Sequence, residues 1–319
     1  MPDLTPVPRH DACSISDFDS QVAALGLPVV ITAGADRSTT LASWTLTELA
    51  ARFGHVKVPV LGRDSNPQDA LGDSGSMKPR RMMSLADYIR CISSDAGTAP
   101  YAGNISLRND PAVAGRLADL LCKCRFPDWL PGSAQDEYRM WIAAAGQLTG
   151  IHNDPYHNFN AQLIGTKRFV LFAPDQHEAL YAEFFNSGMW TSPIDPTAAD
   201  LQKYPKFAAA TGYECELQPG DILFLPRFWW HYVQARKVSV NINRWIVPDD
   251  ARWHQQPQAR RFISYPKLLA QVTAQFESLP AILQEFKREE FERLRAELAT
   301  LIDSDVHCER SEYRQSLNS

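Results

Sequence analysis

Two short segments of the chain carry the side chains best suited to binding a metal ion. TGIHNDPYHNF, residues 149–159, contains His152 and Asp154, and FLPRFWWHYVQA, residues 224–235, contains His231 in a strongly apolar stretch. Two histidines and one carboxylate can hold non-haem iron(II) and leave positions open for other molecules. The alternative for His231 alone is a core histidine satisfied by hydrogen bonds, because an unpaired buried imidazole is costly.

The His-x-acid spacing is informative only through its context. A chain with 8 histidines and 37 acidic residues among 319 is expected to contain about one such match by chance, and this chain has two, at His152 and His307. His307 lies in a polar tail with no histidine after it, whereas His152 and Asp154 follow a strand-like segment. An extended backbone projects side chains two residues apart to the same face, so these two should point together.

Lys167, in the segment IGTKRFVLF, adds a positive charge to the expected site. Strand alternation puts Lys167 on the same face as Phe169 and Leu171, and a lysine on an interior face requires an anion. Beside a three-ligand metal, that anion could be the distal carboxylate of a dicarboxylate cosubstrate whose other end binds the metal. The alternative is that the opposite face of the strand, which begins at Arg168, is the buried one.

These residues lie in a succession of short strands. So many strands with so little helix between them predict an antiparallel barrel or sandwich, and a jelly roll is its natural closure. An insertion of roughly residues 175–212 interrupts the series, and loops of that length are more often functional than incidental. The expected strands are YRMWIAAA (138–145), NFNAQLIG (158–165), KRFVLFAP (167–174), YECELQPGD (213–221), DILFLP (221–226), WWHYVQA (229–235) and VSVNINRWIV (238–247).

The two flanks of this series have different patterns. Before it, an α/β elaboration is expected, with strands at 27–34 and 55–62, a helix at 45–54 that starts with a capping box, and a second helix at 83–94. After it, residues 280–302 form an amphipathic helical pattern that packs either against the barrel or against a second copy of the chain. We therefore expect a jelly-roll domain with its N-terminal elaboration at 1–250 and a helical region at 251–319 that could form a homodimer.

Nothing in the composition indicates a membrane, secreted or nucleic-acid-binding protein. The 319 residues carry a formal net charge of -5, so the chain lacks the positive charge that phosphate backbones attract. No apolar run approaches a membrane span, and the N-terminus has no apolar signal core. The 6 cysteines are scattered, which is typical of free thiols in a reducing compartment. We expect a soluble, cytoplasmic protein.

Three segments resemble one known family: LTGIHNDPYHNFNAQLIGTKRFVLFAP, LQPGDILFLPRFWWHYVQA and SVNINRW. They look like the JmjC-type, cupin-like oxygenases that depend on iron(II) and 2-oxoglutarate. The similarity is greatest to the branch containing the asparaginyl hydroxylase of hypoxia-inducible factor. It covers most of residues 27–248 and is strongest after residue 135. The resemblance implies a mainly β protein with a double-stranded β-helix (jelly-roll, cupin) core, and it implies iron(II), 2-oxoglutarate and O₂ as cofactor and cosubstrates.

The resemblance also implies roles for particular residues. His152, Asp154 and His231 match the iron ligands of the family. Lys167 matches the lysine that binds the distal carboxylate of 2-oxoglutarate, and Thr149 matches a threonine that helps to hold the same carboxylate.

Three further matches concern the surroundings of the cosubstrate. Tyr101, in APYAGNISL, matches a tyrosine in the 2-oxoglutarate pocket. Asn158 and Asn243 match asparagines that line the cosubstrate and the iron, although each could equally be a strand-end asparagine satisfied by backbone. His157 has no counterpart with a defined role in the family.

The activity implied by the resemblance is hydroxylation of an amino-acid side chain in a protein or peptide, with succinate and carbon dioxide as coproducts. A free amino acid or a small natural-product intermediate is the alternative substrate. Two other classes remain: a cupin-type enzyme that uses its metal without 2-oxoglutarate, and a binding module without catalysis. Met189, Trp190 and Tyr156 are candidates for the rim of the substrate site, with local packing as their alternative role.

Overall fold

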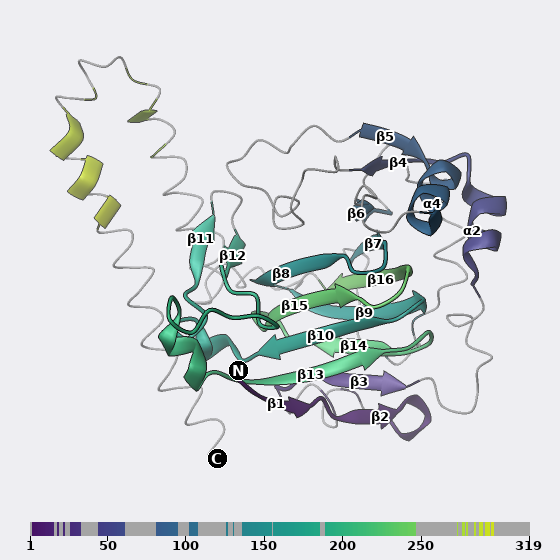
Figure 1. The fold of residues 1–319 in the computed structure, drawn as a ribbon, viewed down its shortest axis with the longest axis horizontal. Coiled ribbons are helices and arrows are strands. Elements are labelled where there is room, and N and C mark those ends of the chain that lie inside the picture. The colour runs from purple at the N-terminus through teal and green to yellow at the C-terminus, as the bar shows by residue number, and fades with distance from the viewer. Residues whose placement is uncertain are drawn as a thin grey trace.

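Two seven-stranded sheets lie face to face and form the body of the protein (Figure 1). In spatial order, the first sheet contains β1 (Asp3–Pro6), β13 (Thr211–Leu217), β10 (Lys167–Phe172), β15 (Trp230–Ala235), β8 (Leu148–Asn153), β12 (Met189–Thr191) and β11 (Glu183–Phe185). The second contains β2 (Arg9–Asp11), β3 (Val29–Thr32), β14 (Ile222–Leu225), β9 (His157–Ile164), β16 (Ser239–Ile246), β7 (Glu137–Ala143) and β6 (Ala102–Ser106).

This architecture comes from a computed structural model that describes most of the chain between residues 2 and 246. The core strands switch between the two sheets along the sequence, except that β10 and β13 lie in the same sheet, and they pair antiparallel, as a jelly roll requires. The predicted fold class, a mainly β protein with a jelly-roll core, is confirmed. The described residues are 2–15, 18, 22, 26–32, 44–60, 81–94, 102–107, 126, 130, 136–154, 156–185 and 189–246, with scattered positions between 273 and 296.

Both faces of β10 are buried, because the long insertion covers the outer one. On the inner face, Phe169 and Leu171 pack into the core between the sheets. On the outer face, Phe172 packs edge-on against Phe207 of the insertion, with ring centroids 5.8 Å apart. Burial alone would therefore not decide which face of β10 Lys167 is on. Lys167 lies on the inner face, with Phe169 and Leu171, and this face leads to the polar interior between the sheets. The insertion contains two short 3-10 helices, η4 (Pro174–Gln176) and η5 (Pro205–Ala209), besides β11 and β12.

Among its described residues, the N-terminal elaboration includes the helices α2 (Leu46–Phe53) and α4 (Leu85–Ser94) and a two-stranded sheet of β4 (Lys57–Val60) and β5 (Arg81–Ser84). Thr45 and Glu48 form the capping box that the sequence predicts for α2. The hydroxyl group of Tyr88 on α4 donates to the carbonyl oxygen of Ile142 on β7, at 2.8 Å, and accepts the N–H of Ala102. This buried tyrosine joins the helical layer to the second sheet.

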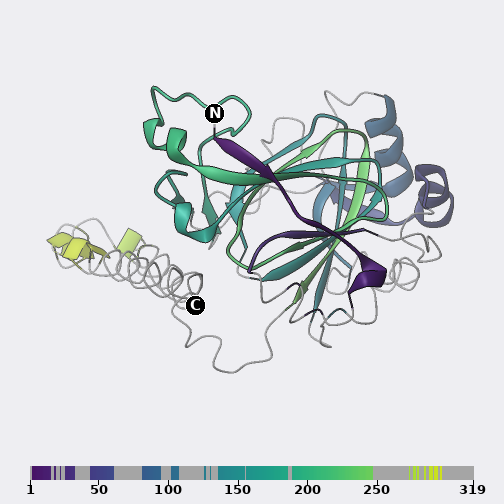
Figure 2. The ribbon, with the colours of Figure 1, turned by 90° about the horizontal axis from the view of Figure 1, so that it is seen from below.

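Two strands at the N-terminus were not predicted. β1 pairs parallel with β13, and β2 pairs parallel with β3, so the first residues of the chain extend one sheet and then the other (Figure 2). Proline is rare inside strands, so Pro6 and Pro8 argue against a strand prediction for this part of the sequence. The structure tolerates both because β1 and β2 are edge strands. The 3-10 helix η1 (Ala12–Ser14), which follows β2, was not predicted either. Further along the chain, the strands that the sequence did not predict are β5, β6, β8, β11 and β12.

Several predictions fall on residues that the structure does not describe. Tyr101, the loop at 62–78 and most of the helical pattern at 280–302 lie outside the described residues. The domain boundary near residue 250 and the homodimer therefore stay predictions. Among the residues that are described, no helix is both long enough and apolar enough to cross a membrane.

Candidate metal centre

The pairing of β8 with β15 is irregular at the predicted ligands. His231 lies opposite His152, and Val233 lies opposite Thr149, so three steps along β8 match two steps along β15. The extra residue of β8, between Thr149 and His152, is a β-bulge. As a consequence, Thr149 and His152 line the same cavity, although strict alternation would place them on opposite faces of the sheet.

His152, Asp154 and His231 lie together between the sheets. Their ligand atoms are all within 4.8 Å of one another, and Nε2 of His231 is 3.7 Å from Oδ2 of Asp154. The two imidazole rings have centroids 4.0 Å apart. Three donors from two segments that are far apart in the sequence thus converge on one small volume, as a metal site requires.

Backbone carbonyl groups fix the orientation of both imidazoles. Nδ1 of His152 lies 2.8 Å from the carbonyl oxygen of Gly150, and Nδ1 of His231 lies 3.1 Å from that of Trp229. A carbonyl can only accept, so Nδ1 carries the proton in each ring and Nε2 keeps its lone pair. This is the usual arrangement behind a metal-bound histidine. The residues present therefore fit a divalent metal ion.

The electrostatics of the cluster also fit a cation. Burial raises the pKa of the Asp154 carboxyl group above its usual value, and the charges of His152 and Arg139 oppose this effect. Burial and the neighbouring His152 lower the pKa of His231 well below its usual value. A neutral imidazole is the form that binds metals, and a bound cation would favour the ionised carboxylate.

Lys167 points inward from β10 and is buried, with 5% of its surface exposed. Its ammonium group donates to Oδ1 of Asn241 on β16. The amide nitrogen of Asn241 donates in turn to Oδ1 of Asn160, at 2.8 Å, and to Oδ1 of Asn243, at 2.7 Å. Burial alone lowers the pKa of Lys167 to about 7. The lysine thus has one amide oxygen as a hydrogen-bond acceptor and, among the described residues, no carboxylate that stabilises its charge.

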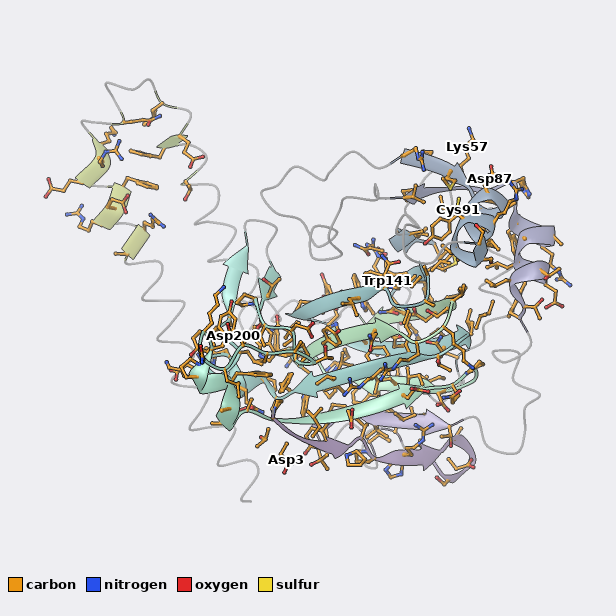
Figure 3. All side chains as sticks on the ribbon, viewed as in Figure 1. Asp3, Lys57, Asp87, Cys91, Trp141 and Asp200 are labelled. Atoms are coloured by element: carbon orange, nitrogen blue, oxygen red, sulfur yellow. The ribbon has the colours of Figure 1, made fainter. Side chains whose placement is uncertain are left out.

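One cavity joins this lysine to the histidine and aspartate cluster. Of the residues predicted for the site, Thr149, His152, Asp154, Lys167, His231 and Asn243 all line the cavity. Asn158 is buried on the same face of β9 as Asn160 but does not line it. The residues that line the cavity come from both sheets, and one of them, Trp141 on β7, is labelled in Figure 3. The geometry brings the predicted residues together, and their roles as ligands stay predictions.

Other residues of the cavity escaped the sequence analysis. Asn160, Asn241, Trp141, Phe169 and Val233 line it too. A signal existed for two of them: in SVNINRW, Asn241 alternates with Asn243, and in NFNAQ, Asn160 alternates with Asn158. Residues two apart on a strand share a face, so each pair of asparagines should have been taken together.

The chain is similar to proteins that are already characterised. The profile of the family described as a cupin-like domain (Cupin_8) matches residues 15–251. Lysine-specific demethylase 8 of Xenopus tropicalis is 29% identical over 250 residues, which cover 76% of this chain and 53% of the relative. The human bifunctional peptidase and (3S)-lysyl hydroxylase JMJD7 is 24% identical over 244 residues, which cover 68% of this chain and 76% of the relative.

A third relative matches a shorter region. Human HSPB1-associated protein 1 is 36% identical over 133 residues, which cover 40% of this chain and 27% of the relative. The chain spans about half the length of the Xenopus demethylase, at 53%. The family profile, by contrast, covers both sheets of the jelly roll from β3 to β16 and every residue of the cavity. The chain therefore belongs to the cupin-like domain family, the JmjC-type group that the resemblance in its sequence indicates.

Proposed function

We propose that the protein is an iron(II)- and 2-oxoglutarate-dependent oxygenase that hydroxylates an amino-acid side chain of a protein or peptide. The observation that carries the proposal is the convergence of three metal-ligand atoms within 4.8 Å in a cavity that also contains the buried Lys167. His152, Asp154 and His231 would hold the iron, which when bound activates O₂ so that 2-oxoglutarate yields succinate and carbon dioxide and a substrate C–H bond becomes an alcohol.

The chain's own residues would bind and orient the cosubstrate. Lys167 has three ammonium hydrogens, of which Asn241 accepts one, so hydrogens remain for a carboxylate. A carboxylate beside Lys167 would stabilise a charge that burial otherwise disfavours. Thr149 and Asn243, which line the same cavity, would supply neutral hydrogen bonds. The apolar wall of Phe169 and Val233 would exclude water from between these groups.

The test is an assay of succinate release with iron(II), 2-oxoglutarate and candidate peptides, combined with mass spectrometry of the peptides. The names of two relatives, a lysine-specific demethylase and a (3S)-lysyl hydroxylase, direct the choice toward peptides with unmodified and methylated lysine. A gain of one oxygen atom in the peptide would support hydroxylation. Loss of a methyl group would show that the reaction is demethylation instead. Turnover only on free amino acids or other small metabolites would contradict a peptide substrate.

The affinity for 2-oxoglutarate is expected to fall as the pH rises above about 7. The pKa of Lys167 is lowered to about 7 by burial, so above this pH the free protein must take up a proton before the ammonium can bind a carboxylate. Each further pH unit should raise the Kd about tenfold until the pKa of the bound lysine is reached. Calorimetric titrations between pH 6 and 9 would measure this slope, and a Kd that is constant over the range would contradict the role of Lys167.

Replacing Asn241 by aspartate is expected to raise the KM for 2-oxoglutarate about tenfold or more, with a smaller effect on kcat. The new carboxylate would lie where Oδ1 of Asn241 accepts from Lys167, and it would neutralise the ammonium within the protein. Steady-state measurement of succinate release checks this prediction. An unchanged KM in Asn241→Asp would show that Lys167 does not bind the cosubstrate.

A further inference from the structure

The turn that precedes β15 contains a strained residue. Phe228 has a φ of 67°, in the left-handed region that a bulky side chain adopts only at an energetic cost. Phe228 is buried and lies three residues before His231. Strain of this kind persists only where the surrounding structure holds it, so the contacts of the turn show what keeps His231 in place.

Two consecutive N–H groups of the turn donate to Asp154, one of the predicted ligands, and to His157, three residues after it. The N–H of Arg227 donates to Nδ1 of His157 at 3.3 Å, and the N–H of Phe228 donates to the carbonyl oxygen of Asp154 at 2.8 Å. Asp154 and His157 therefore connect their own segment to the turn that precedes His231. Of these two hydrogen bonds, the one to the imidazole of His157 is made by a side chain, and the one to Asp154 is made by the backbone.

The opposite end of the turn reaches the expected metal centre directly. The indole N–H of Trp229 donates to the carbonyl oxygen of Gly26 at 3.1 Å, which anchors the residue to the start of β3. The carbonyl oxygen of Trp229 accepts from Nδ1 of His231, also at 3.1 Å. A displacement of residues 226–229 would therefore move the group that orients His231.

The His157 ring has the properties that an acceptor needs. It is partly buried and stacks on Phe224, with ring centroids 5.8 Å apart and planes 24° apart. Burial and the charge of Arg227 lower the pKa of His157 to about 4. The ring is thus neutral at pH 7, and Nδ1 has a lone pair free to accept the N–H of Arg227.

We propose that His157 is a positioning residue of the metal centre: its Nδ1 holds the strained turn at the place where the Trp229 carbonyl orients His231. This inference rests on the proposed function, because it takes His152, Asp154 and His231 as metal ligands. His157 itself is not a ligand and does not line the cavity. It acts through the backbone of the turn.

The test measures cobalt(II) binding to the metal-free protein, so it needs no substrate and no turnover. In His157→Phe the ring and its stacking on Phe224 are kept while the acceptor is lost, and the cobalt Kd is expected to rise about 10- to 100-fold. In His157→Asn, Oδ1 takes the position of Nδ1, so the Kd should stay within about threefold of the wild-type value. Phe224→Leu, which disturbs the stacking and keeps the acceptor, is the matched control and should also bind cobalt normally.

The visible absorption spectrum of the bound cobalt adds a readout of geometry. We expect His157→Phe to shift the ligand-field bands and His157→Asn to restore them. Normal cobalt affinity and spectrum in His157→Phe would overturn the inference while the proposed metal centre stands. Loss of binding in both His157→Phe and His157→Asn, with Phe224→Leu intact, would also overturn it. A wild-type protein that binds no cobalt would instead reject the proposed function itself, and the inference with it.

Discussion

Asp154→Ala is expected to reduce succinate release by about 100-fold or more. The substitution removes one of the three donors that lie within 4.8 Å of one another, and loss of groups that merely support metal ligands already costs about 10- to 100-fold. The metal-free protein should remain folded, because burial raises the pKa of Asp154 and the substitution removes a desolvated acid. Succinate release and metal content, measured on the same preparation, check the prediction.

Asp200→Ala is the matched control for this experiment. Asp200, labelled in Figure 3, is exposed on the insertion, and its carboxylate accepts from the nearby backbone N–H groups of Gln202 and Lys203. Its replacement should leave succinate release unchanged. Retention of metal and of turnover in Asp154→Ala would contradict the assignment of this carboxylate as a ligand.

Lys167→Met is expected to weaken 2-oxoglutarate binding by about 30-fold to several thousand-fold. This range corresponds to the roughly 2 to 5 kcal/mol that is lost when one partner of a buried charge pair is truncated. Methionine keeps the length of the side chain and removes the charge that burial already disfavours, so the fold should be stabilised or unaffected. Calorimetry with 2-oxoglutarate in the presence of manganese(II) measures the effect.

The neighbouring residue provides the control for Lys167→Met. Arg168 lies on the opposite face of β10 and forms an ion pair with Glu214, at 2.7 Å, that is partly exposed to solvent. Arg168→Met should leave the 2-oxoglutarate affinity unchanged, because an ion pair of this kind contributes little and lies outside the cavity. If Lys167→Met leaves activity largely intact, the protein uses its metal without 2-oxoglutarate.

The strand pattern could be predicted from the sequence because one face of each core strand is apolar. The alternation in KRFVLF and the spacing of His152 and Asp154 both depend on a period of two, which regular strands obey. The presence of Thr149 in the cavity could be predicted only from the family resemblance, because the bulge in β8 breaks that period of two. Gly150, which lies inside the bulge, is the one local residue that indicates such a break.

Long-range contacts explain what the sequence pattern did not predict. β1 and β2 become strands only because β13 and β3 offer free edges to Leu4 and His10 and their neighbours. The link from His157 to Arg227 joins residues 70 positions apart and has no local signal. The role of Asn241 as the partner of Lys167 likewise depends on two strands meeting across the interior. Pairing between distant segments, rather than propensity, decides these features.

In the proposed function, His152, Asp154 and His231 bind a single divalent metal that recruits 2-oxoglutarate beside Lys167. Titration of 2-oxoglutarate into the metal-free protein, with and without manganese(II), tests it most directly. We expect one tightly bound 2-oxoglutarate per chain with manganese and at least tenfold weaker binding without it, and no gain from manganese in Asp154→Ala. Equal binding with and without the metal, or a full response to manganese in Asp154→Ala, would contradict it.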